Sequence, residues 1–377
     1  MRGRTYKITN RSYLQIAYLY FAFLFLFILY FLINYKTLCL SYNTSDWLIN
    51  YEDGGFKRRG LGGTIVFFLS DILNIKISNI VFGLELVCYG IFFFYLTKLL
   101  PKKLNIGLFI ILICPLSLGF NILEPNIVGK KEILLFALFS YFNYLILYRK
   151  LNRFKEIVIL LILFFITLIH ELTIFYVPYF FIVLYLDEKK INIKKYINYY
   201  LAVIFPVILI YFFGSKINNG TSISLLQSKG INCGEYGVFQ YNESGNFINT
   251  YLRHIESYSL YIIPVIIGFI ILNLYFKYYK INYKWKQILI ILFLYSLPLF
   301  YFANDWGRWI NIHFTLITII LLTYFSRKKV IFPPYFIYFI PLMLVWGYSI
   351  LEKGFHFNTY LNYLVLNKIL HLNYSFY

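Results

Sequence analysis

Long apolar runs separated by short polar turns repeat from one end of the chain to the other. A helix needs about 20 apolar residues to cross the hydrocarbon core of a bilayer, whereas an outer-membrane barrel would show short segments of alternating hydrophobicity. The pattern therefore predicts an all-α fold, a polytopic transmembrane helical bundle of about 11 spans (10–12) that forms a single integral membrane domain over residues 1–377. We expect these spans at 13–35, 79–99, 106–120, 133–148, 157–169, 173–186, 196–213, 260–275, 288–302, 312–325 and 336–351.

Basic residues orient these runs, because loops that stay in the cytoplasm carry an excess of lysine and arginine. Four basic residues precede the first run and predict a cytoplasmic N-terminus: Arg2, Arg4, Lys7 and Arg11. With that start, almost every Lys/Arg-rich turn falls on the cytoplasmic side. Three groups fall outside, next to acids or glycines, and such charges at a membrane surface are candidates for function. They are Lys57, Arg58 and Arg59; Lys130 and Lys131; and Arg308.

Four further segments do not fit the pattern of spans. Residues 36–63 are expected to form the first external loop, and the run after it, 64–75, is too short to span and holds Ser70 and Asp71. We interpret this run as a re-entrant or interfacial helix, which is tolerated where it lines protein or a wet cavity. Residues 214–257 are expected to form a long external loop that acts as a lid or recognises an acceptor. The tail, 353–377, is interpreted as external or interfacial.

Composition supports the membrane class. The chain is 60% hydrophobic and 14% charged, with a mean hydropathy of +0.67, whereas a soluble domain carries about 25% charged residues. The net charge of +19 comes mostly from the short turns, so it reports topology and does not predict a nucleic-acid partner. The four cysteines lack metal-ligand spacing. Cys39 and Cys233 fall in external loops, where a disulfide between them is permitted but not required.

The first charged cluster is the stretch Asp53-Gly-Gly-Phe-Lys-Arg-Arg-Gly-Leu-Gly-Gly63. Its glycines allow a tight backbone that can approach an anion, and Arg58 and Arg59 can bind phosphate oxygens with two hydrogen bonds each. Asp53 or Glu52 would act as a base towards a hydroxyl group or orient an arginine. The alternative is a glycine-rich turn whose arginines contact lipid headgroups.

Two more clusters lie further along the chain. The turn from Glu124 to Glu132 places Lys130 and Lys131 outside, where they suit a second phosphate or carboxylate contact; an ordinary loop with compensating charges is the alternative. His170 and Glu171 end an apolar run, so they should face a cavity in the bundle. His170 would transfer a proton, with Glu171 fixing its tautomer or acting as the base itself, unless the pair is only a structural contact between helices.

The fourth cluster is Asn304-Asp305-Trp306-Gly307-Arg308-Trp309. Asp305 and Arg308 stand three residues apart and can pair on one helical turn. An aromatic belt with an arginine reaching the interface is the alternative to a binding site. No Walker loop, dinucleotide fingerprint or catalytic triad spacing is present, and the HExxH zinc pattern fails because position 174 is Ile174. We therefore expect no cofactor and no metal.

These clusters give the chain a resemblance to the multi-spanning enzymes of bacterial surface polysaccharide assembly. The glycine–arginine stretch, the turn Gly129-Lys-Lys-Glu132 and the pair His170-Glu171 are similar to segments of O-antigen and capsule proteins. The closest class is the Wzy-like O-antigen polymerases, within or near the GT-C glycosyltransferases. The resemblance implies a multi-pass enzyme of the bacterial inner membrane that uses polyprenyl-linked sugars on the periplasmic face. It also implies a catalytic acid at Asp53, with Asp46 and Glu52 as alternatives, and pyrophosphate-binding arginines at Arg58, Arg59 and Arg308.

The resulting hypothesis is a polymerase that joins polyprenyl-pyrophosphate-linked oligosaccharide repeat units. Its catalytic residues would be Asp53, or His170 with Glu171. Its partners would be the lipid-linked oligosaccharide, membrane lipids, a chain-length regulator and a flippase, with no nucleic acid. Two alternatives stay open: a GT-C transferase that adds one sugar from a polyprenyl phosphate, and a transporter or flippase, which should carry charge near the bilayer midplane. The residues expected to bind substrate are Glu52, Arg58, Arg59, Glu124, Lys130, Lys131, Asp305 and Arg308.

Overall fold

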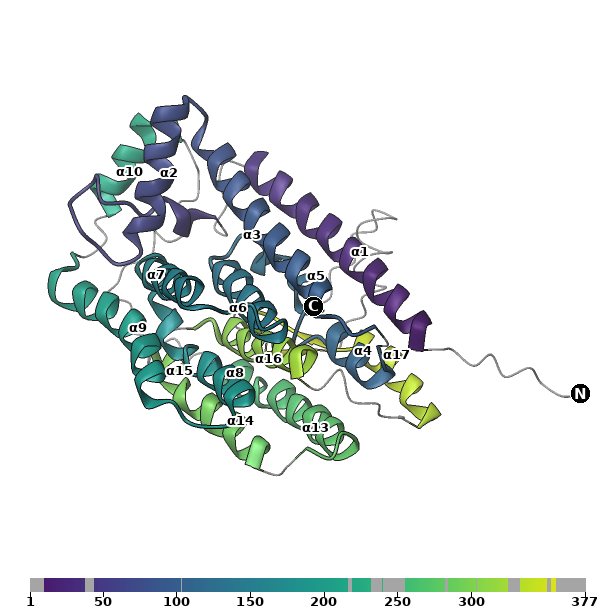
Figure 1. Ribbon diagram of the computed structural model, residues 1–377. Helices are drawn as coiled ribbons and strands as arrows, with labels where there is room; N and C mark the ends of the chain where they lie inside the picture. Colours follow the sequence, from purple (N-terminus) through teal and green to yellow (C-terminus); the bar gives the residue numbers. More distant parts are fainter. Residues whose placement is uncertain are drawn as a thin grey trace, which may run out of the picture.

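The chain folds into a bundle of helices, with one short strand pair among the residues that the structure describes (Figure 1). The computed structural model describes residues 10–37, 44–102, 104–215, 219–231, 239, 255–281, 284–302, 304–324, 333–350 and 354–356. Cys39 and Cys233, between which a disulfide is permitted, lie outside these residues, as do most of the loop at 214–257 and almost all of the tail. The two strands, β1 (Gly347–Tyr348) and β2 (Phe355–His356), pair antiparallel.

The helical elements alternate between long rods and short pieces. Those of the N-terminal half are α1 (Asn10–Thr37), η1 (Ser45–Leu48), α2 (Gly60–Leu73), α3 (Ile77–Leu99), α4 (Ile106–Ile113), α5 (Phe120–Leu123), η2 (Pro125–Ile127), α6 (Glu132–Leu147), α7 (Arg153–Ile169), η3 (Glu171–Phe175) and α8 (Pro178–Glu188). The others are α9 (Ile193–Phe213), α10 (Asn219–Ser228), α12 (Ile255–Ser259), α13 (Ile262–Tyr278), α14 (Lys284–Tyr295), α15 (Leu297–Phe302), α16 (Trp306–Tyr324), η5 (Pro334–Tyr338) and α17 (Phe339–Leu344).

Four segments of the described chain are long and apolar enough to cross a bilayer. They are Tyr13–Lys36 in α1, Ile77–Leu99, Ile193–Phe213, and Ile255–Tyr278 across α12 and α13. The all-α class and the membrane character are thus supported, whereas the number of about 11 spans is not confirmed. The short helix expected at 64–75 is present as α2, which begins four residues earlier, at Gly60.

Several expected spans are interrupted helices. The run at 106–120 forms the eight-residue α4, followed by a turn, and the run at 288–302 is divided at Ser296 between α14 and α15. All eight residues of α4 are buried. Interrupted backbone is tolerated at membrane depth only where protein or a cavity surrounds it, because lipid cannot satisfy its free N–H and C=O groups. The α4 run therefore lies in the interior of the bundle, whereas α14 and α15 expose large apolar side chains such as Ile291 and Tyr301.

Helix α16 is the buried centre of that interior. Every residue from 307 to 323 is buried, and α16 packs against α6, α3, α4 and α8. Its polar side chains find partners inside the bundle: Asn311 donates to the Ser117 carbonyl at 2.8 Å, and both ring nitrogens of His313 are hydrogen-bonded, at 2.6 Å each, to Tyr179 and Ser296. Hydrogen bonds of this kind fix which helices meet in a membrane protein.

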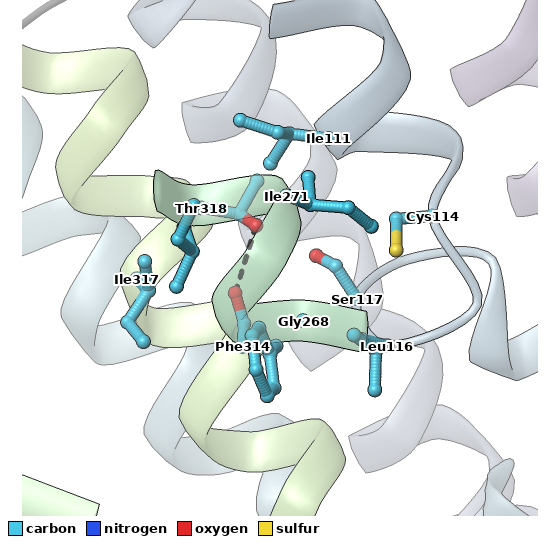
Figure 2. Close-up of a pocket in the computed structure, with 10 residues that line it drawn as sticks. Ile111, Cys114, Leu116, Ser117, Gly268, Ile271, Phe314, Ile317 and Thr318 are labelled. Atoms are coloured by element: carbon cyan, nitrogen blue, oxygen red, sulfur yellow. Dashed lines mark hydrogen bonds between the residues drawn. The ribbon is translucent and has the colours of Figure 1, made fainter. Parts of the chain in front are cut away.

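Helix α13 packs closely on α16 because it presents Gly268 at the contact (Figure 2). A Cβ atom at this position would lie 2.2 Å from Cζ of Phe314 and 2.7 Å from Cδ1 of Leu116. The same region encloses a small cavity of about 10 Å³, lined also by Cys114 and Ser117. Small residues at this contact match the usual composition of membrane helix interfaces.

Helices α2 and α10 lie together at one end of the molecule, beyond the ends of α6 and α7 (Figure 1). The loop that leads into α2 is fixed to η1, because the N–H of Gly63 donates to the Ile49 carbonyl at 3.1 Å. A Cβ atom on Gly63 would lie 2.1 Å from that oxygen, so only glycine permits the approach. This contact holds the first charged cluster against the bundle.

Candidate functional site

The loop between η1 and α2 divides the first cluster into two parts. Asp53 forms an ion pair with Lys57 and accepts a hydrogen bond from Ser222 of α10, and these side chains of Asp53 and Lys57 are almost fully buried. Arg59, the residue before α2, has a left-handed backbone with φ of 63°. Among non-glycine residues this conformation is uncommon. It directs Arg59 towards the end of α7, away from the Asp53–Lys57 pair.

Both arginines of the motif contact one carboxylate, that of Glu171. Nε of Arg59 lies 3.0 and 3.1 Å from the two carboxylate oxygens, and its Nη2 lies 2.9 Å from Oε1. Nε of Arg58 lies 3.3 Å from the same Oε1. The side chain of Arg58 is 51% exposed, and those of Arg59 and Glu171 are 15% and 17% exposed. This group is the accessible layer of the site.

A deeper layer joins the ends of α6, α7 and α16. Glu132, the first residue of α6, accepts hydrogen bonds on the same oxygen from His170 Nε2, at 3.1 Å, and from Nη2 of Arg308. Arg308 also pairs with Asp305 through Nη1, as their spacing of three residues predicts. His170, Glu132 and Arg308 have at most 5% of their side chains exposed. Three clusters far apart in the sequence thus form one ion-pair network.

Asp46, Trp47 and Lys131 lie between the two layers. Asp46 is buried, with its Oδ2 3.8 Å from Nη1 of Arg59. The ammonium of Lys131 is 3.3 Å from the Ile169 carbonyl and 5.7 Å from the centre of the Trp47 ring. Lys131 is almost fully buried, and its ammonium also lies 3.5 Å from the carbonyl of Arg59. It therefore connects the first, second and third clusters.

Electrostatics keeps the acids of this network ionised. Burial alone would raise the pKa of Asp46, but Arg59, Lys130, Lys131 and Arg308 lower that pKa to about 2. Burial also opposes ionisation of Glu171, and Arg59 and then Arg58 overcome it, so its pKa lies below the ordinary value. Burial lowers the pKa of Lys131 to about 8, since it disfavours the charged ammonium.

The tautomer of His170 follows from its partner. Burial lowers the pKa of His170 despite the nearby carboxylate of Glu132, whereas Arg308 and His170 hold the pKa of Glu132 low against burial. A neutral histidine beside a carboxylate must donate from the nitrogen that faces it, because a carboxylate only accepts. Nε2 of His170 therefore carries the proton. Nδ1 carries a lone pair that has no partner among the described residues.

The other predicted residues take different positions. Glu52 is exposed, and its N–H donates to Asn50. Glu124 accepts from Asn126 at 2.8 Å and from the N–H of Ile350 at 3.4 Å, so it ties η2 to the β1–β2 segment. Lys130 is buried, and its charge acts on Asp46. The structure thus unites most of the predicted set but holds Asp53 in a separate pair.

The sequence reasoning did not select Glu132, and it named Asp46 only as an alternative to Asp53. It also passed over Glu85, a buried acid inside the apolar helix α3, whose Oε1 faces Gly129. A lone acid within an apolar span was the available signal for Glu85. Trp47 connects this region to the site, because its ring N–H donates to the Gly129 carbonyl at 3.0 Å.

Within the described part of the chain, no three His, Cys, Asp or Glu side chains come together as a metal-ligand set. The arrangement is instead one of buried and half-buried ion pairs with an accessible arginine pair at its edge. Such a site can bind an oxyanion and move a proton. No family model, curated protein or solved structure matches this chain, so its function is inferred from the site alone.

Proposed function

We propose that the chain is a membrane glycosyltransferase of surface polysaccharide synthesis. In this proposal it transfers a polyprenyl-pyrophosphate-linked glycan onto a hydroxyl of another lipid-linked repeat unit, at the external face of the membrane. One observation carries the proposal: charges from four remote parts of the sequence meet at the ends of α6, α7 and α16. A lipid-linked anion would be met there, at the end of an apolar bundle.

The cations would bind and activate the leaving group. Arg58 and Arg59 present guanidinium groups at the accessible edge, and Lys130 and Lys131 lie behind them. Fixed cations stabilise the negative charge that develops on a departing pyrophosphate, and they act strongly where water is excluded. The bond between the anomeric carbon and the phosphate oxygen breaks as the acceptor oxygen bonds to that carbon.

The acceptor hydroxyl must lose its proton in the same reaction. Three groups were predicted for this role, and their settings differ. Asp53 is engaged by Lys57 and Ser222, Glu171 by the two arginines, and His170 holds a free lone pair on Nδ1. We assign the proton transfer to His170, with Glu132 orienting its ring. A positioned base of this kind contributes about 10²- to 10⁴-fold to a rate.

Replacing Arg58 tests the proposal most directly, because its exposed side chain can be removed with little effect on packing. Arg58→Ala should abolish long-chain polysaccharide in cells and leave a single repeat unit, with unchanged protein level. Lys229→Ala is the matched control, since Lys229 is another partly exposed cation paired with a carboxylate, at 2.8 Å from Asp71. Wild-type chain lengths in Arg58→Ala would contradict the proposed site.

A single-sugar transferase is the second candidate, favoured by the position of Asp46. This acid of the first loop lies buried among the cations, where an acid close to a donor phosphate would stand. Loss of a single-sugar transferase would alter glycan composition or branching, whereas loss of a polymerase shortens the glycan to one repeat unit. Gel analysis of the glycan in the same Arg58→Ala strain separates the two.

A transporter is the third candidate, favoured by Glu85 within the apolar helix α3. Intramembrane acids often mark a transport path. Uptake of lipid-linked sugar by proteoliposomes, without any bond formation, would support this alternative over glycosyl transfer.

A further inference from the structure

The accessible arginine pair is already occupied by an anion of the protein itself. Four nitrogen–oxygen contacts between 2.9 and 3.3 Å join Arg58 and Arg59 to the carboxylate of Glu171. The two oxygens of Glu171 lie in the fork of the Arg59 guanidinium, side by side. A phosphate group presents oxygens to arginine in the same paired geometry. One fork cannot hold both anions at once.

Glu171 also differs from the deeper acid in how firmly it is held. Glu132 is 3% exposed and its partners are buried. If its carboxylate moved away, the buried guanidinium of Arg308 would lose this counter-ion. Glu171 is 17% exposed, and one of its partners, Arg58, is half in solvent. Water reaches the outer group through the exposed Arg58 and can solvate the charges when they separate, which weakens such an ion pair. The outer pair is therefore exchangeable, and the inner one is not.

We propose that Glu171 is the resident counter-ion of the Arg58–Arg59 site and that a phosphate-class ligand takes its place on binding. The proposal rests on the proposed function, and it identifies Glu171 as a specificity-determining residue. Replacing one carboxylate by another singly charged anion gains nothing. A pyrophosphate offers more charge and more oxygens than Glu171, so it displaces the carboxylate where chloride or acetate does not.

The direction in which a substitution of Glu171 changes the affinity for pyrophosphate tests this exchange. Glu171→Gln removes the competing charge and keeps a side chain of the same shape, so the full-length protein in detergent should bind inorganic pyrophosphate about tenfold more tightly in calorimetric titration. Glu171→Asp keeps the charge but shortens the reach to both arginines, and an affinity gain of about threefold is expected. Should Glu171→Gln fail to fold, the shorter variant decides. Glu156→Gln, which changes a glutamate paired with Lys195 at 3.5 Å, is the control and should bind as the wild type does.

The outcomes separate the inference from the proposed function. Tighter binding in both Glu171 variants but not in the control supports the exchange. Unchanged or weaker binding in these variants, with wild-type binding that Arg59→Ala abolishes, overturns the exchange and leaves the proposed function standing. No pyrophosphate binding by the wild type or by Glu171→Gln overturns both.

Discussion

The buried pair of Glu132 with Arg308 predicts a large loss of stability when it is broken. Removing one partner of a buried ion pair costs about 3–5 kcal/mol, because the remaining charge is left without water or a counter-ion. Glu132 is 3% exposed and Arg308 5%. Arg308 keeps a second partner in Asp305, which is 20% exposed. Glu132→Gln should therefore lower the free energy of unfolding by about 3 kcal/mol, the lower end of that range.

Equilibrium unfolding of the purified chain in mixed detergent measures this change. Glu188→Gln is the control, because Glu188 lies 2.9 Å from Lys195 with both side chains about 20% exposed. The control should change the free energy of unfolding by about 1 kcal/mol or less, because water reaches this pair and Lys195 keeps Glu156 as a second partner at 3.5 Å.

A double-mutant cycle then isolates the pair. Arg308→Met in the Glu132→Gln background should cost less than in the wild type, with a coupling of about 2 kcal/mol, because the first change already removed its partner. A Glu132→Gln protein within about 0.5 kcal/mol of the wild type, with no coupling to Arg308, would refute the account of the deeper layer.

Two further predictions concern Lys131 and the α13–α16 contact. The pKa of Lys131 is about 8 when folded and 10.5 ordinarily, so the unfolded chain binds the extra proton between these values. Stability should therefore rise from pH 8 to 10.5 by on the order of 3 kcal/mol, and Lys131→Met should lack this rise in unfolding titrations compared across pH. Gly268→Ala should destabilise by about 1–3 kcal/mol through collision with Phe314 and Leu116. Gly83→Ala in α3 is the control and should not destabilise the protein, because its added Cβ meets nothing within 4 Å. Equal unfolding midpoints for Gly268→Ala and the wild type would contradict the close contact between α13 and α16.

The sequence was sufficient for the helical class and for most of the residues that meet in the candidate site. Apolar runs predict helices wherever lipid or protein surrounds them, and charges placed against the orientation rule identified Arg59, Lys131 and Arg308. These residues do meet, because three helix ends share one level of the bundle. Periodicity did not reveal the breaks at α4 and at Ser296, since an apolar run reads alike whether it is buried in protein or in lipid.

The sequence could not predict which side chains of the site pair with each other. His170 and Glu171 are neighbours in the chain, yet the extended backbone of His170 ends α7 and sends the two side chains to different partners. The expectation that Glu171 would fix the tautomer of His170 therefore gives way to Glu132, 38 residues away. A side-chain direction of this kind depends on one φ angle, which no spacing rule supplies.

The left-handed backbone at Arg59 has a consequence for how this position would vary. Left-handed φ values cost a side-chain-bearing residue about 1–2 kcal/mol and cost glycine almost nothing. The backbone conformation at this position, taken alone, thus favours glycine over arginine. Arg59→Gly would relieve the backbone but leave the carboxylates of Asp46 and Glu171 without this arginine partner, so the guanidinium group is needed both for anion binding and for the charge balance of the site.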